Sequence, residues 1–342
     1  MSETLSGSDA GVIMLRSDRL AVEIVSPGTE YQGTRFDWTG FITQVTLDSS
    51  GSTQPHTFCV PESLQPGQGT GGIGLCNEFG NDLAVGYADV RPGDLFPKLG
   101  IGLLRRPDEA AYNFFRPYEI AQPFPVEVDT AADRATFTVQ PLDCRGYAVR
   151  LRKAITVHGN QVQIAYQLEN VGRQPIVTNE YVHNFVGIDR HPMGPDYRLR
   201  LPYRIEIEMP SGVLGRMLPR FVRKLLPAAV LARVERILLR RMLGVLIIGD
   251  QEIGFRATPH QPFYCLLKGF ARSERPQWEL VHVPSGVGMR ETDDRAPSRV
   301  AVWGTTHVIS AEVFVDVHVQ PGETQAWTRR YEFLASSGQV EG

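Results

Sequence analysis

The 342-residue sequence lacks several motifs that would assign it to a common class of protein. Its four cysteines, Cys59, Cys76, Cys144 and Cys265, form no Cys-x-x-Cys pair, which argues against a zinc knuckle or a redox centre. In a chain of this length, free buried thiols are expected rather than two disulfides. A Gly-x-Ser-x-Gly nucleophile elbow is also missing, and no cysteine lies in a recognisable nucleophile motif.

The sequence has neither a strong net charge nor a long hydrophobic run. Its formal net charge is −3, which gives no reason to expect a nucleic-acid partner. The longest apolar stretch, MLGVLIIG, is far too short to cross a bilayer. The N-terminal residues show no basic segment followed by an apolar run, so no secretory signal is expected. A cytoplasmic enzyme or binding protein is the default expectation.

Most of the chain alternates apolar and polar residues with a period of two, which is typical of half-buried antiparallel strands. In QVQIAYQL, one face carries Val162, Ile164, Tyr166 and Leu168. The preceding segment YAVRLRKAITV alternates in the same way, and the HGN between the two indicates a hairpin turn. Near the C-terminus, EVFVDVHV places an unbroken valine face opposite a face that begins with Glu312.

Glycine and proline interrupt these segments at short intervals, with 33 glycines and 24 prolines in the chain. No region alternates strand with helix as a doubly wound fold does. The pattern therefore predicts an all-β protein, with a single large antiparallel β-sandwich domain over residues 1–342.

One segment, residues 213–243, departs from the β pattern. Its sequence has helical spacing and helix-forming residues, and Pro219 and Pro227 are expected to divide it into short helices. It holds eight arginine or lysine residues and a single acid, Glu235. The favoured interpretation is a basic amphipathic helical insertion that packs its leucines on the sandwich. Contact with a membrane surface, an oligomer interface and a lid over an anionic substrate are the alternatives.

The stretch TNEYVHNF, residues 178–185, places a histidine, a glutamate and two asparagines in a segment with a strand pattern. Side chains alternate along a strand, so His183 is expected to share a face with Tyr181 and Phe185, opposite Glu180. A second aromatic stretch, YNFFRPYEI, surrounds one arginine with rings. It is either the edge of a core with a salt-bridged arginine or a platform for stacking and hydrogen bonding a sugar.

Four segments, in order, resemble the galactose mutarotase-like (aldose 1-epimerase) superfamily. They are NEFG, LENVGRQPIVTNEYVHNF, VAVWGTTHVISAEVFV and VQPGETQAWTRRYEF. Together they cover the chain from about residue 20 to residue 334, and they leave the helical insertion unmatched. The resemblance implies the galactose mutarotase-like supersandwich, with the last segment as its closing hairpin.

The resemblance also implies acid–base catalysis on a sugar ring. In the family, a histidine protonates the ring oxygen and a carboxylate takes the proton of the anomeric hydroxyl, so the two groups must lie on opposite sides of one ring. His183 is the candidate acid and Glu312 the candidate base. A direct overlay of the family motif puts the histidine position at Glu180, which competes with His183. Glu279 and Glu291 compete with Glu312.

The early region departs from the family pattern. Where the resemblance places a sugar-binding arginine after Asn77, this sequence has Glu78. FPKLGIG, with Lys98, stands where the family usually supplies a second histidine. These departures indicate a remodelled pocket, and its basic residues favour an acidic or phosphorylated sugar. The expected substrate-binding residues are Asn77, Glu78, Lys98, Arg116, Tyr118, Glu180 and Trp303.

The sequence thus predicts a carbohydrate-active, aldose 1-epimerase-like isomerase that acts on a small sugar or sugar derivative. Two alternatives stay open: a non-catalytic carbohydrate-binding protein, and a lyase or isomerase of a biosynthetic pathway on the same scaffold. The other histidines match no known ligand spacing, so neither a catalytic metal nor a cofactor is expected. The sequence leaves the oligomeric state open.

Overall fold

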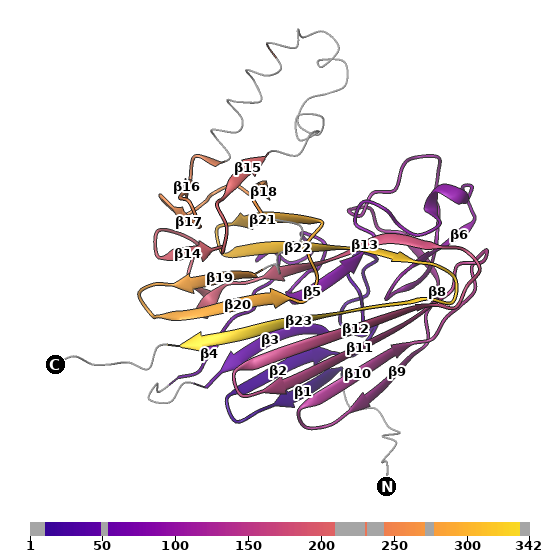
Figure 1. Ribbon diagram of the computed structural model, residues 1–342, viewed down its shortest axis with the longest axis horizontal. Coiled ribbons are helices and arrows are strands. Elements are labelled where there is room, and N and C mark those ends of the chain that lie inside the picture. The colour runs from indigo at the N-terminus through magenta and orange to yellow at the C-terminus, as the bar shows by residue number, and fades with distance from the viewer. Residues whose placement is uncertain (1–10, 49–53, 209–229, 231–242, 271–276, 336–342) are drawn as a thin grey trace, which may run out of the picture.

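The computed structural model describes residues 11–48, 54–208, 230, 243–270 and 277–335. These residues form two ten-stranded antiparallel sheets and one three-stranded sheet. Figure 1 shows the two large sheets stacked as the layers of a sandwich. The prediction of an all-β protein with a large antiparallel sandwich is therefore confirmed.

The first sheet contains the strand that carries TNEYVHNF. In sheet order its strands are β1 (Val12–Arg16), β2 (Leu20–Val25), β3 (Phe41–Leu47), β5 (Gly74–Phe79), β13 (Ile176–Phe185), β22 (Val308–Val319), β21 (Arg299–Thr305), β18 (Phe263–Lys268) and β15 (Glu206–Glu208), with β4 (His56–Thr57) paired to β3. At the centre, β13 lies between β5 and β22, so the chain's early, middle and late parts meet there.

The second sheet forms the other layer of the sandwich. Its order is β16 (Leu246–Ile248), β17 (Glu252–Phe255), β14 (Tyr197–Arg200), β19 (Gln277–His282), β20 (Val287–Asp293), β23 (Thr324–Ala335), β12 (Gln161–Asn170), β11 (Val149–His158), β10 (Arg134–Val139) and β9 (Val126–Thr130). The small sheet is β6 (Leu95–Lys98), β7 (Gly102–Arg105) and β8 (Glu119–Pro123), and two 3-10 turns, η1 (Tyr87–Asp89) and η2 (Ile188–Arg190), complete the described elements.

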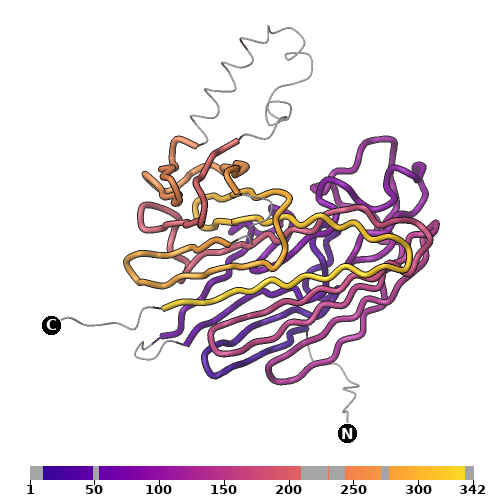
Figure 2. Tube along the Cα trace, in the orientation of Figure 1, coloured from indigo at the N-terminus to yellow at the C-terminus, as the bar shows by residue number. Residues whose placement is uncertain are grey.

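The predicted HGN hairpin is confirmed, because β11 and β12 pair along their whole length up to His158 and Gln161. The predicted closing hairpin is wrong. β22 belongs to the first sheet and β23 to the second, so the turn at 320–323 carries the chain between layers. The turn at 171–175, between β12 and β13, does the same. Figure 2 shows both crossings at one end of the sandwich, and Asn170 joins them through its bond to the Val319 carbonyl at 2.9 Å.

The sandwich core follows the predicted alternation. The apolar face of β12, from Val162 to Leu168, is buried between the sheets, as is the valine face of β22. On the opposite face of β22, Glu312 and Phe314 are also buried, whereas Asp316 and His318 are exposed. This second face is therefore covered only over part of its length. The four cysteines are all buried and free, as predicted.

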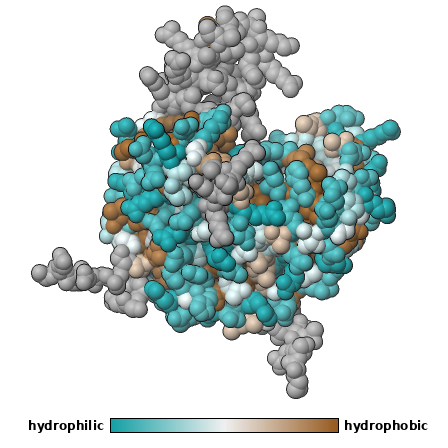
Figure 3. Space-filling view, viewed as in Figure 1, coloured by the Kyte–Doolittle hydropathy of each residue, from teal (hydrophilic) through white to brown (hydrophobic). Residues whose placement is uncertain are grey.

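The predicted basic insertion at 213–243 lies outside the described residues, apart from Val230 and Leu243. Within the described part of the chain, no helix has the length and apolar character of a membrane span. The face in Figure 3 is mainly hydrophilic, with apolar side chains scattered among polar ones.

Candidate functional site

Strand β13 has polar side chains on both faces, and each face has its own surroundings. Glu180 and Asn184 point into the sandwich, toward the second sheet, where they meet Arg329 and Glu291. His183 points the other way. We call that side the outer face; a loop with Phe36 and the small sheet β6–β8 cover part of it. The predicted separation of Glu180 from His183 by strand alternation is therefore confirmed.

His183 and Glu312 lie together on the outer face. The distance between His183 Nε2 and Glu312 Oε1 is 3.3 Å, and each residue is only 4% exposed. The ring of Phe185 stacks on the imidazole at a centroid distance of 4.0 Å, and Trp303 meets it edge-on at 5.3 Å. An imidazole and a carboxyl group thus share a nearly dry, aromatic environment.

Burial shifts the pKa values of both groups in the directions that favour their neutral forms. It lowers the pKa of His183 well below its usual value, and the nearby charge of Arg35 lowers it further. It raises the pKa of Glu312 to about 8, although Arg35 and Arg299 act against this shift. At neutral pH the pair therefore holds one proton, and the carboxyl group is the favoured carrier. The other ring nitrogen, Nδ1, is buried and has no hydrogen-bond partner among the residues that the structure describes.

The pair was expected to stand on opposite sides of a sugar ring. The structure shows direct contact instead, which corrects that expectation. The reason is the register of the sheet: β13 and β22 are neighbours, and cross-strand residues on one face lie close to each other. No pyranose fits between two groups whose polar atoms are 3.3 Å apart. A sugar would have to approach them from one side.

A second polar cluster lies on the outer face, centred on Glu78, which is fully buried. Its carboxylate accepts hydrogen bonds from Arg35 Nε at 3.2 Å, Lys98 Nζ at 3.0 Å and the Tyr181 hydroxyl at 3.1 Å. Arg35 also donates to the Tyr181 hydroxyl, and Lys98 to that of Tyr112. Burial lowers the pKa of Lys98, and Glu78 opposes that shift. Glu78 thus holds two cations on the same face as the histidine.

Arg35 is the site residue that the sequence analysis missed. Its guanidinium carbon lies 4.5 Å from the ring centroid of Phe36, 4.8 Å from that of Phe114 and 5.2 Å from that of Phe115. Two of these rings belong to YNFFRPYEI, which was expected to surround Arg116. Arg116 instead pairs with Asp108 at 2.8 Å and is partly exposed. In the sequence, Arg35 stands next to an aromatic residue in GTRFDWTG. Its position in a loop, however, gave no indication of which strand its side chain faces.

The other predicted binding residues divide between the two faces. Trp303 contacts His183, and Tyr118 stacks on Tyr112 with a centroid distance of 5.4 Å beside the Lys98 cluster. Asn77 lies on the interior face, where its amide oxygen accepts from a buried lysine, Lys153, at 2.6 Å. Glu180, also interior, is bound by Arg329. The structure therefore brings Glu78, Lys98, Tyr118 and Trp303 to the outer face, and it places Asn77 and Glu180 on the interior face. Arg116 is paired with Asp108 instead of with Glu78 or Glu312.

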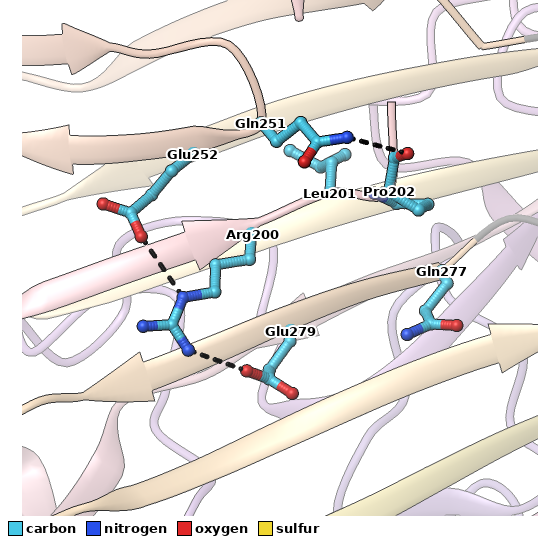
Figure 4. Close-up of a pocket in the computed structure, with 7 residues that line it drawn as sticks. All are labelled: Arg200, Leu201, Pro202, Gln251, Glu252, Gln277 and Glu279. Atoms are coloured by element: carbon cyan, nitrogen blue, oxygen red, sulfur yellow. Dashed lines mark hydrogen bonds and ion pairs between the residues drawn. The ribbon is translucent and has the colours of Figure 1, made fainter. Parts of the chain in front are cut away.

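The competing base residues are also separated. Glu291 is buried between the sheets. Glu279 lies on the outward surface of the second sheet, in a depression of about 410 Å³ (Figure 4). There, Arg200 bridges Glu252 at 3.2 Å and Glu279 at 3.1 Å. The described residues that line this depression include paired surface charges, and none of them is a histidine. Of the three glutamates, only Glu312 contacts His183.

The residues that the structure describes contain no group of three or more histidine, cysteine, aspartate or glutamate side chains that could hold a metal ion. The side chains on the outer face offer proton transfer by the His183–Glu312 pair, combined with hydrogen bonding and stacking by the groups around it.

No protein-family profile matches the sequence, and no curated protein is significantly similar to it. Solved structures do share the fold. A galactose mutarotase related enzyme from Lactobacillus acidophilus superimposes with a TM-score of 0.55 at 11% identity, covering 97% of this chain and all of that one. A galactose mutarotase-like protein from Lactobacillus casei gives 0.54 at 11% identity, with 95% and 100% covered.

A third structure, an aldose epimerase homologue from C. elegans, gives a TM-score of 0.53 at 10% identity, with 95% of this chain and 99% of that one covered. The chain therefore has the galactose mutarotase-like fold, as the resemblance implied. At such low identity the likeness concerns the fold and leaves the chemistry to be inferred from the site.

Proposed function

We propose that this protein is an acid–base isomerase of the aldose 1-epimerase kind, which interconverts the anomers of a sugar or sugar derivative through His183 and Glu312. The observation that carries the proposal is the contact between these two side chains, 3.3 Å apart and almost fully buried on the outer face of a mutarotase-like sandwich. Ionisable groups with strongly shifted pKa values and few partners are typical of catalytic sites.

Anomer exchange transfers protons without net consumption. To open the ring, a base takes the proton of the anomeric hydroxyl, the C1–O1 bond becomes a carbonyl, and the C1–O5 bond breaks. The electron pair of that bond takes a proton from an acid at the ring oxygen. Rotation about C1–C2 and the reverse transfers close the ring on its other face. A pair that shares one proton supplies both roles.

The pKa directions indicate which member begins. Glu312 holds the proton in the resting pair and His183 is neutral, so Glu312 donates to the ring oxygen and His183 accepts from the anomeric hydroxyl. This order is the reverse of the one that the family resemblance implies. Ring opening leaves an imidazolium and a carboxylate, and ring closure restores the neutral pair. Arg35 and Arg299, whose charges act on Glu312, favour the carboxylate at the intermediate stage.

The surroundings of the pair contain the aromatic rings that sugar-binding sites use. Aromatic rings cover the apolar faces of sugar rings, and Phe185 and Trp303 lie against His183. Because the pair is nearly buried, binding requires side chains to move. Trp303 is partly exposed and contacts His183, and we assign that movement to it.

One observation favours a second candidate function, a non-catalytic carbohydrate-binding protein. His183 and Glu312 satisfy each other in direct contact, as a structural pair would. Such a protein would bind a sugar through the aromatic side chains and the Arg35 cluster, and it would leave the anomer ratio to equilibrate at the uncatalysed rate.

Saturation-transfer NMR with a panel of neutral, acidic and phosphorylated aldoses tests the proposal. The protein should accelerate exchange between the α and β signals of at least one sugar. Glu312→Gln and His183→Gln should each reduce this acceleration by roughly 10²- to 10⁴-fold, the usual contribution of a general acid or base. Asp316→Asn, on the same strand but exposed, should keep full activity. Binding without faster exchange would instead favour the second candidate, and equal exchange in wild type and Glu312→Gln would refute the proposal.

A further inference from the structure

The ladder between β13 and β22 is interrupted where the pair lies. Residues Ile176 to Tyr181 pair with Val319 to Phe314, and the pairing then stops. It resumes in the same register at the Val186–Ile309 bridge, where two backbone hydrogen bonds of 3.1 and 3.0 Å form. Since the register is unchanged, neither strand contains an extra residue, and the interruption is not a β-bulge.

Both strands keep their other partners through this interruption. β13 stays paired with β5 as far as Phe185, and β22 stays paired with β21 from Val308 to Phe314. The break therefore belongs to the β13–β22 boundary alone. His183 and Glu312 occupy this break on the outer face.

Asn184 occupies the same break on the interior face. Its side-chain amide nitrogen donates to the Ala311 carbonyl of β22 at 3.3 Å. A side chain thus supplies a bond across a boundary that elsewhere relies on the backbone ladder. An Asn side chain can make two donor bonds and still accept at its oxygen, and here all these functions are used.

The remaining bonds of Asn184 reach the second sheet. Its amide nitrogen also donates to Glu291 Oε2 of β20 at 2.6 Å, and its oxygen accepts from the Tyr331 hydroxyl of β23 at 3.0 Å. Asn184, Glu291 and Tyr331 are each at most 1% exposed. These bonds tie the interrupted boundary to two strands of the opposite layer. Because the bonds are fully desolvated, they make this connection rigid.

We propose that Asn184 is a positioning residue: by bonding Ala311, Glu291 and Tyr331 at once, it fixes the interruption between β13 and β22 and so sets the spacing between His183 and Glu312. The effect on catalysis rests on the proposed function, whereas the effect on the geometry of the pair does not. Loss of the side-chain bonds lets the two strands change their separation, and the imidazole then loses its present contact with the carboxyl group.

The chain offers a matched control in Asn170. This asparagine is also fully buried, and its amide also donates to a β22 carbonyl, that of Val319, as well as to the carbonyl of Gln174. It lies at the crossing between the sheets rather than at the pair. Asn170→Leu and Asn184→Leu remove comparable hydrogen bonds and keep the number and branching of the side-chain heavy atoms, so they should perturb folding alike but the pair differently.

The imidazole ¹⁵N and ¹H NMR signals of His183, assigned by their loss in His183→Gln, report on the pair without any substrate. Asn184→Leu should shift these signals, and Asn170→Leu should leave them in place. Tyr331→Phe removes one bond to Asn184 and keeps the ring, so it should shift the His183 signals in the same direction but by a smaller amount. It serves as the test if Asn184→Leu does not fold. Unchanged His183 signals in a folded Asn184→Leu variant would overturn the inference. If that variant does not fold, unchanged signals in Tyr331→Phe would overturn it.

Kinetics provide a second readout. In an active enzyme, Asn184→Leu should lower kcat for anomer exchange by roughly 10- to 100-fold with KM nearly unchanged, because misplacement of a reacting group by a fraction of an ångström costs rate more than binding. Equal losses of kcat in Asn184→Leu and Asn170→Leu would mark the effect as general destabilisation and refute the positioning role. If the wild type exchanges no sugar, the proposed function fails, and the NMR signals alone decide the role of Asn184.

Discussion

Both faces of β13 bury ionisable side chains, but the side chains on the two faces have different partners. On the interior face, Arg329 lies within 3.4 Å of Glu180, Glu291 and Asp293, so each acid has a cation in reach. On the outer face, His183 and Glu312 contact each other, and within the described part of the chain Nδ1 of the imidazole has no hydrogen-bond partner. Arg329 compensates the interior acids in part, although burial still raises the pKa of Glu291 to about 8, whereas the outer pair holds a single shared proton.

This difference separates structural from chemical roles within one strand. On the interior face, Arg329 donates to Glu180 and Asp293, and these acids keep its guanidinium charged. A buried group without such compensation stays close to the point where its proton can move, which is what acid–base catalysis requires. The contrast predicts that substitutions in the interior ion-pair cluster act on stability, and that substitutions at the outer pair act on rate and on the pH dependence of stability.

The largest effect on stability should come from Arg329→Met. The substitution leaves three acids buried without their cation, and breaking a buried ion-pair cluster from one side typically costs about 3–5 kcal/mol. Urea denaturation followed by circular dichroism measures the change in the free energy of unfolding. A loss below about 1 kcal/mol, the size typical of an exposed ion pair, would remove the distinction between the two faces.

Glu312→Gln should instead raise the free energy of unfolding, by an amount that depends on pH. The pKa of Glu312 rises from its ordinary 4.5 to about 8 on folding. The native state therefore keeps a proton that the unfolded state releases, and this residue lowers stability progressively as the pH rises from 4.5 to 8. The amide does not titrate, so the free energy of unfolding of the variant should rise relative to that of the wild type over this range, by up to roughly 4 kcal/mol near pH 8.

The measurement is the difference in unfolding free energy between Glu312→Gln and wild type, taken at several pH values from 5 to 8. Glu291, whose pKa burial also raises to about 8, is present in both proteins, so its contribution cancels in the difference. A difference that does not vary with pH would show that Glu312 is already ionised in the native protein.

Much of this contrast could be read from the sequence, because alternation along a strand is a local property. The faces of TNEYVHNF and of the valine-rich strand follow from their spacing alone. The partners of those strands do not. The turns at 171–175 and 320–323 look like hairpin turns, but they carry the chain between layers. Turn residues indicate that the chain reverses, without indicating which strand it joins.

Arg35 shows a second limit. It lies in the irregular segment between β2 and β3, and three aromatic rings and Glu78 fix its position. Nothing in the local sequence favours Arg35 over Arg116 as the site residue. Arg116 has more aromatic neighbours in sequence, yet its partner is a surface aspartate. Charge compensation in a folded protein is set by contacts between distant segments, so neither the pairing of Glu78 with Lys98 nor that with Arg35 could be predicted.

A smaller effect should sharpen the comparison between these two arginines. Arg35→Lys keeps the charge but loses the planar fork that bonds Glu78 and Tyr181 together. Affinity for the sugar identified in the exchange panel should fall by about tenfold, the equivalent of one charged hydrogen bond. Arg116→Lys should leave affinity within twofold. Isothermal titration calorimetry measures both, and equal losses would place Arg116 at the site after all.

The most direct test of the outer pair compares His183→Gln, Glu312→Gln and the double variant in the same saturation-transfer experiment. If the two side chains share one proton and act as a unit, each single substitution should abolish nearly all the acceleration, and the double variant should be no slower than either. If the losses multiply, so that the double variant is slower by the product of the single effects, the two groups act independently and the shared-proton pair is contradicted.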